Sequence, residues 1–177
     1  NKYLYVSTSN SNEGPGISTS GLPASSLNVF SSGAVLAEEV GRDVYGVTTG
    51  RDIILHFSSR GAEGYKPDVV SPGAAVSTVP NFMSRDIMWG TSMSSPYTTG
   101  VMSLLLSAMV KEKPDYKIPS NLLYKIVKMG AVPLEGYTHL DQGGGLINVM
   151  NAYNLLKKVP LNEDYDTYDI SAFSPGM

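Results

Sequence analysis

The chain has 177 residues, of which 13 are basic and 16 acidic, giving a net charge of −3, and it contains no cysteine. An acidic balance without a clustered lysine or arginine face argues against a nucleic-acid partner, because phosphate binding needs a concentrated positive field. The missing cysteines exclude disulfides, zinc–thiolate sites and thiol nucleophiles. Charged residues make up 16% of the chain, against about 25% in an average domain. A chain this poor in charge has a large interior, or packs part of its surface against another segment or chain.

Strands and helices are predicted to alternate along the chain. Short apolar segments predict strands at residues 3–7, 27–30, 53–57 and 69–70, and longer patterns predict helices at 92–111, 119–129 and 149–158. The 92–111 helix carries apolar residues on nearly every face, which is typical of a buried helix. Its apolar run, 101–110, is too short to span a bilayer. The alternation indicates an α/β domain with a largely parallel sheet.

The end of the chain differs in composition from the rest. Glycines at 143–145 predict a turn with dihedral angles that other residues avoid, directly before the last helix. After Pro160 the sequence becomes acidic. We expect one domain over residues 1–158, followed by an acidic linker or the start of another domain at 159–177.

The chemistry concentrates at Ser92, within the sequence GTSMSSP at residues 90–96. This serine lies in the first turn of the predicted buried helix. The free N–H groups and the positive end of that helix can stabilise an oxyanion formed there. A simpler interpretation is that the serine only caps the helix.

Four segments in order resemble the motifs of the subtilisin-like serine peptidases. They are SNEGPG at 11–16, FSSRG at 57–61 with KPDVVSPG at 66–73, the serine motif at 90–96, and DQGGGLIN at 141–148. The resemblance implies a three-layer α/β/α fold with a largely parallel sheet, of which this chain supplies the C-terminal half of the catalytic domain. The segment VPNF at 79–82 is most similar to the branch of large subtilisin-like enzymes that includes tripeptidyl peptidase II and pyrolysin.

The resemblance also assigns roles to individual residues. It makes Ser92 the nucleophile and Asn12 the oxyanion donor, and it places Gly21, Ser9 and Gly90 at the substrate. Gly21 matches the glycine at the base of the pocket for the residue before the scissile bond, where it leaves room for a large side chain.

Two points about the asparagines stay open. Ser11 stands where the family has glycine, so Asn10 remains a second candidate for the oxyanion donor. Both asparagines could instead only support a turn.

The other two members of a catalytic triad are not apparent. In subtilisin-like enzymes the order is Asp, His, Ser, and no room remains before Asn12 for the first two. An upstream segment or a companion chain would have to carry them. Of the two histidines, His56 lies in a predicted strand. His139 with Asp115 would reproduce the order of α/β-hydrolases, but that motif requires glycine at position 94.

Two functions are therefore compatible with the sequence. The first is a serine endopeptidase acting on a protein or peptide substrate, although a tripeptidyl peptidase is not distinguished from it. The second is an inactive subtilisin-like scaffold used for binding or assembly. The resemblance implies no cofactor for catalysis and a secreted or cell-surface location.

Structural calcium is common in this family, and Asp164, Asp166 and Asp169 offer oxygen ligands. Their spacing matches no known calcium loop, so a solvated acidic linker is the favoured interpretation.

Overall fold

The computed structural model describes residues 2–62, 64–76 and 87–159. The 79–82 segment and the three aspartates of the acidic tail lie outside these residues.

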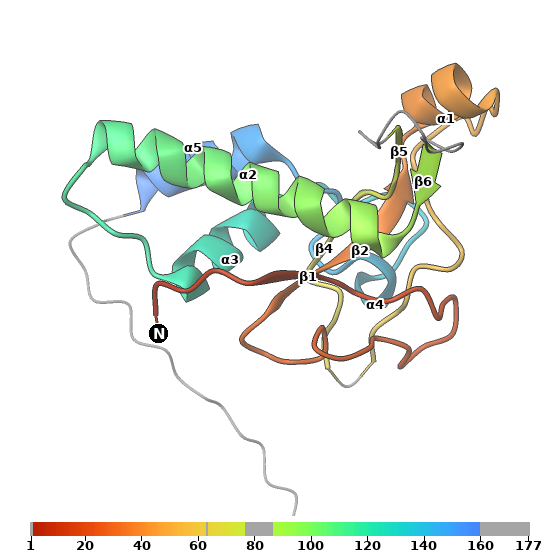
Figure 1. Ribbon diagram of the computed structural model, residues 1–177, viewed down its shortest axis with the longest axis horizontal. Coiled ribbons are helices and arrows are strands. Elements are labelled where there is room, and N and C mark those ends of the chain that lie inside the picture. The colour runs from red at the N-terminus through yellow and green to blue at the C-terminus, as the bar shows by residue number, and fades with distance from the viewer. Residues whose placement is uncertain (1, 63, 77–86, 160–177) are drawn as a thin grey trace, which may run out of the picture.

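A four-stranded sheet is built around one buried strand, β2 (Phe30–Leu36). β1 (Ser7–Ser9) and β4 (Val69–Pro72) pair with it in parallel, and the short β3 (Ile53–Ile54) pairs antiparallel. A separate antiparallel pair, β5 (Ala74–Val76) and β6 (Ile87–Trp89), leads into the long helix α2 (Figure 1). The predicted α/β architecture with a largely parallel sheet is confirmed.

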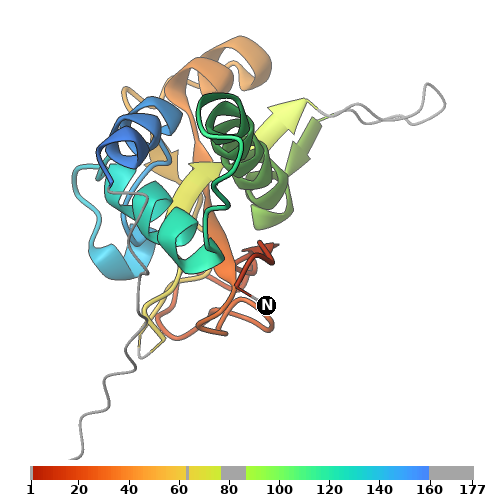
Figure 2. The ribbon, with the colours of Figure 1, turned by 90° about the vertical axis from the view of Figure 1, so that its left-hand side faces the viewer.

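Five helices accompany the sheet in the described part of the chain. They are α1 (Glu38–Tyr45), α2 (Thr91–Glu112), α3 (Ser120–Gly130), α4 (His139–Gln142) and α5 (Val149–Lys158). Helices α2, α3 and α5 lie together on the sheet (Figure 2) and contribute most of the largest core cluster. The sheet contributes Phe30 and Val69 to this cluster.

The two faces of β2 are covered differently, because successive side chains of a strand point to opposite faces. On one face, Ser32 donates a hydrogen bond from its hydroxyl to Thr98 of α2 at 2.8 Å. On the other, Val35 packs with Val70 and with Tyr137 from the segment that leads into α4. The sheet therefore lies between α2 and the 134–146 segment, as a three-layer fold requires.

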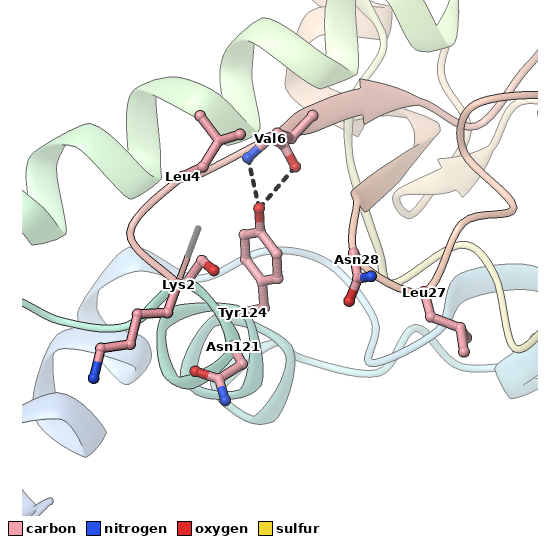
Figure 3. Close-up of a pocket in the computed structure, with 8 residues that line it drawn as sticks. Lys2, Leu4, Val6, Leu27, Asn28, Asn121 and Tyr124 are labelled. Atoms are coloured by element: carbon pink, nitrogen blue, oxygen red, sulfur yellow. Dashed lines mark hydrogen bonds between the residues drawn. The ribbon is translucent and has the colours of Figure 1, made fainter. Parts of the chain in front are cut away.

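The first strand lies later in the chain than predicted. The hydroxyl of Tyr124 accepts a hydrogen bond from the Val6 N–H at 2.6 Å and donates one to the Val6 carbonyl at 3.1 Å (Figure 3). The Ser120 N–H likewise donates to the Lys2 carbonyl at 2.7 Å. These contacts bind the start of the chain to α3, and pairing with β2 as a strand begins only at Ser7.

A cavity of about 390 Å³ lies between this first segment, the 27–28 loop and α3 (Figure 3). Its lining includes Leu4, Leu27 and Tyr124, and it contains none of the predicted site residues.

The long helix was expected to be buried on all sides, and that prediction is wrong for this chain. Leu105 and Met109 are buried, but Leu104 and Val110 are each 62% exposed and Tyr97 is 50% exposed. Within the described residues, α2 therefore contributes one face to the core and leaves several apolar side chains exposed outside that face.

Candidate active site

Ser92 occupies the second residue of α2, because the helix begins at Thr91 with Gly90 as its N-cap. The N-cap residue is Gly90, which makes no side-chain capping hydrogen bond, so the interpretation of Ser92 as the N-cap is wrong. The side chain of Ser92 is exposed. The N–H of Ser92 belongs to the first turn, where amide groups have no acceptor within the helix. An exposed hydroxyl thus lies beside the N–H of Ser92 itself, at the positive end of a 22-residue helix.

The side chain of Asn12 is held against the start of the same helix. Its Oδ1 accepts hydrogen bonds from the Thr91 amide at 3.0 Å and from the Thr91 hydroxyl at 2.9 Å. With the oxygen bound in this way, the Nδ2 amide lies near Gly90, where an added Cβ would be 3.6 Å from it. The structure therefore brings a side-chain amide donor next to the residues that precede Ser92.

Asn10 points elsewhere. It is fully buried, and its Nδ2 donates to the Ser59 carbonyl at 2.8 Å. Between the two asparagines, Ser11 has a φ of +87°, the left-handed region that favours glycine. The backbone at Ser11 thus has a conformation that glycine adopts without strain, and Asn12, not Asn10, faces α2.

Gly21 lies against this turn. Its N–H donates to the Asn10 carbonyl at 3.4 Å. A Cβ added at Gly21 would lie 3.2 Å from both Cβ and Oγ of Ser11. Ser9, the third predicted substrate-binding position with Gly90 and Gly21, is half-buried at the end of β1, where it pairs with Ser32.

Hydroxyl groups and a glycine fix the first turns of α2 to the sheet. Ser71 donates to the Ser94 carbonyl at 2.9 Å, and the Ser94 hydroxyl donates back to the Ser71 carbonyl at 3.0 Å. The Gly90 N–H donates to the Gly73 carbonyl at 2.8 Å. A Cβ at Gly73 would lie only 2.4 Å from that of Ala34, so glycine permits this close approach. Ser92 is thereby placed by a rigid contact between helix and sheet.

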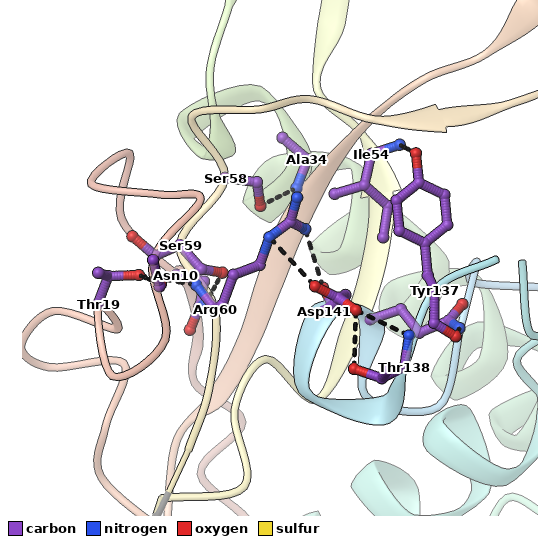
Figure 4. Close-up of polar contacts among 12 residues, drawn as sticks. Asn10, Thr19, Ala34, Ile54, Ser58, Ser59, Arg60, Tyr137, Thr138 and Asp141 are labelled. Atoms are coloured by element: carbon purple, nitrogen blue, oxygen red, sulfur yellow. Dashed lines mark hydrogen bonds and ion pairs between the residues drawn. The ribbon is translucent and has the colours of Figure 1, made fainter.

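A buried arginine ties the loop around Gly21 to α4 (Figure 4). The Arg60 N–H donates to the Thr19 hydroxyl at 2.9 Å, and the Thr19 N–H donates to the Arg60 carbonyl at 3.1 Å. At its other end, the guanidinium pairs with Asp141, with Nε 3.5 Å from Oδ1. Burial lowers the pKa of Arg60, and the nearby Asp141 carboxylate opposes that shift. Asp141 in turn caps α4 by accepting from the Thr138 N–H and hydroxyl at 2.7 Å each.

Neither histidine lies in a triad with Ser92 among the described contacts. His56 is exposed in the turn after β3, with its ring centroid 5.7 Å from that of Phe57. The predicted strand 53–57 ends at Ile54, so this histidine is not in a strand. His139 is exposed at the first residue of α4, on the far face of the sheet from α2.

Two residues of this arrangement were not predicted, Thr91 and Gly73. Both lie within the quoted motifs, Thr91 directly before the serine and Gly73 at the end of KPDVVSPG. Their roles depend on contacts with Asn12 and Ala34, which are distant in sequence, so spacing alone gave no signal.

The described residues contain no group of three or more histidine, aspartate or glutamate side chains able to hold a metal ion. Nor is any helix of this part of the chain long and apolar enough to cross a membrane.

A sequence model of the Subtilase family matches residues 2–130. The chain belongs to the subtilase family. It is 35% identical to pyrolysin of Pyrococcus furiosus over 84% of the present chain. It is 31% identical to tripeptidyl-peptidase 2 of Caenorhabditis elegans over 90% of the present chain. It spans only 12% of either relative. The expected likeness to this branch is confirmed.

The fold agrees with that of solved subtilase structures. The maturation protease PagA superposes with a TM-score of 0.67 at 20% identity, over 85% of this chain and 50% of the PagA chain. A protease domain of PatA gives a TM-score of 0.63, with 48% of that chain covered. Coverage of about half of each agrees with the expectation that this subtilase chain corresponds to the C-terminal half of a catalytic domain.

Proposed function

We propose that this subtilase chain carries the nucleophile and the oxyanion donors of a serine endopeptidase. The observation that carries the proposal is the pair of hydrogen bonds from Thr91 to Asn12 Oδ1, at 3.0 and 2.9 Å, with the Asn12 amide near Gly90, two residues before Ser92. A carbonyl attacked by the Ser92 hydroxyl would then place its developing negative charge between Asn12 Nδ2 and the Ser92 N–H. Donors fixed in this way stabilise the tetrahedral intermediate without having to reorganise.

The reaction is acyl transfer to Ser92 followed by hydrolysis of the acyl-enzyme, with a protein or peptide as substrate. A histidine takes the hydroxyl proton and returns it to the leaving amine, and an aspartate orients that histidine. We place both on an upstream segment or a companion chain. The chemistry uses side chains, backbone and water, so it needs no cofactor.

Exposed apolar side chains on α2 support a contact with that other half. Tyr97 and Leu104, seven residues apart and therefore on one side of the helix that begins next to Ser92, are each at least 50% exposed. Apolar surface of this kind is stabilised when another element covers it. A segment packed there would lie along the helix that places the nucleophile.

A fluorophosphonate probe tests the proposal on the intact protein with all its segments. We expect stoichiometric labelling of Ser92 and no labelling after Ser92→Ala, with the fold retained. Ser107, which is exposed on the same helix, provides the matched control, because Ser107→Ala should label normally. An intact protein that does not label at Ser92 would instead be the inactive scaffold.

Peptides with a blocked amino end distinguish an endopeptidase from a tripeptidyl peptidase. A substrate whose amino end is blocked should be cleaved as well as its free counterpart. Strict dependence on a free amino end, with release of tripeptides, would identify a tripeptidyl peptidase instead. We propose a secreted or cell-surface location on the family resemblance alone, and fractionation of the native host would test it.

A further inference from the structure

The side chain of Ser11 lies in the space beside Gly21. A Cβ built on Gly21 would meet Cβ and Oγ of Ser11 at 3.2 Å each. Apart from the chain neighbours of Gly21, no other described residue comes within 4 Å of that position. The space that the missing side chain of Gly21 leaves open is therefore partly filled by the side chain of Ser11.

The direction of this side chain is set by the backbone. Ser11 has a φ of +87° and its carbonyl accepts from the Ser59 N–H at 3.1 Å, which fixes the peptide on one side. On the other side, the Gly21 N–H donates to the Asn10 carbonyl at 3.4 Å and holds the two loops together. The loops cannot separate to admit a larger group without breaking these contacts.

The position also faces the substrate. Asn12, the next residue, holds the amide that lies near Gly90, two residues before Ser92. Ser11 is only half-buried, so its side chain remains partly accessible. The substrate residue whose carbonyl lies at Asn12 and Ser92 would direct its own side chain past Ser11.

We propose that Ser11 is a specificity-determining residue, which closes the base of the pocket beside Gly21 and restricts the residue before the scissile bond to small side chains such as alanine. This proposal rests on the peptidase function proposed above. It replaces the expectation that Gly21 leaves room for a large apolar or aromatic group. In an apolar pocket, one methylene more or less changes the specificity constant by about 10- to 200-fold, so one Cβ with its hydroxyl is enough to control the preference.

The test compares two blocked peptides that differ only in alanine or phenylalanine before the scissile bond. In the intact protein, the alanine peptide should have the higher kcat/KM. Ser11→Gly should raise the ratio of phenylalanine to alanine hydrolysis by at least about tenfold. Glycine adopts a positive φ without strain, so this variant should fold normally.

Ser18 offers a matched control, since it is an exposed serine of the same loop with a φ of +60°. Ser18→Gly relieves a similar backbone strain without opening the space at Gly21, so its substrate ratio should stay that of the wild type. An unchanged ratio in Ser11→Gly, or an equal shift in both variants, would overturn the proposal.

Fluorophosphonate labelling separates this result from failure of the proposed function. If Ser92 labels in every variant while the ratio does not change, only the role of Ser11 is refuted. If Ser92 does not label in the wild type, both proposals fall.

Discussion

Replacing Thr91 with valine should weaken catalysis by loosening the side chain of Asn12. Thr91 is fully buried, and its hydroxyl and its amide both donate to Asn12 Oδ1, at 2.9 and 3.0 Å. Valine has nearly the shape of threonine but lacks the hydroxyl, so it removes the first bond and keeps the second. One such bond contributes about 0.5–1.5 kcal/mol, which corresponds to roughly a 2- to 12-fold loss of kcat/KM if it is expressed fully in the transition state. Removing the amide itself by Asn12→Ala should cost about 10²- to 10³-fold.

The assay is kcat/KM on a blocked chromogenic peptide, measured for both single variants and the double variant of the intact protein. Because the oxyanion forms only in the transition state, the loss should appear in kcat with KM nearly unchanged. In the Asn12→Ala background the valine substitution should have almost no further effect, since the group that it positions is already absent. A loss of the same factor in both backgrounds would show that Thr91 acts by another route and would refute this reasoning.

Two predictions concern stability. Gly73→Ala should lower the free energy of unfolding by about 1–3 kcal/mol, because the new Cβ would lie 2.4 Å from that of Ala34 and 2.8 Å from Oγ of Ser94. Gly64→Ala is the control, since a Cβ added there meets nothing within 4 Å. An equal midpoint of chemical denaturation for the two variants would contradict the prediction. Burial raises the pKa of Tyr124 above its ordinary value of 10.0, so the folded state favours the protonated phenol. The stability that Tyr124 contributes is therefore complete below about pH 10 and is lost as the pH rises above that value. Tyr124→Phe should therefore lose stability less steeply above pH 10, and an equally steep alkaline slope in both proteins would speak against this assignment.

The long helices could be predicted closely because their signals are local. Helix α5 has the predicted bounds, and α3 begins one residue after Pro119, the predicted first helical residue. Proline marks a helix start through its own geometry, without help from distant residues. The short elements α1, α4, β5 and β6 were missed, since a few residues carry too little periodicity to be distinguished from a loop.

The position of β1 could not be predicted, because a distant side chain decides it. The apolar residues before Ser7 have the composition of a strand, yet the backbone of Val6 is bound by the hydroxyl of Tyr124, 118 positions away. A similar limit applies to α2, whose sequence is apolar on both faces. Composition cannot show which face of the helix packs against the core of this chain. In the structure it is the face that carries Leu105 and Met109.

At the candidate site too, the sequence indicates which residues are involved but not the direction of their side chains. The motif around Asn12 indicated the residue, but the direction of its amide depends on two bonds from Thr91, 79 positions later. Ser11 was visible as a departure from the family's glycine, while the positive φ that turns its side chain toward Gly21 was not. Both contacts lie wholly within this chain. If the proposed function holds, the oxyanion donors are therefore arranged before the other half packs against α2, and that half has to supply proton transfer but not the geometry at Ser92.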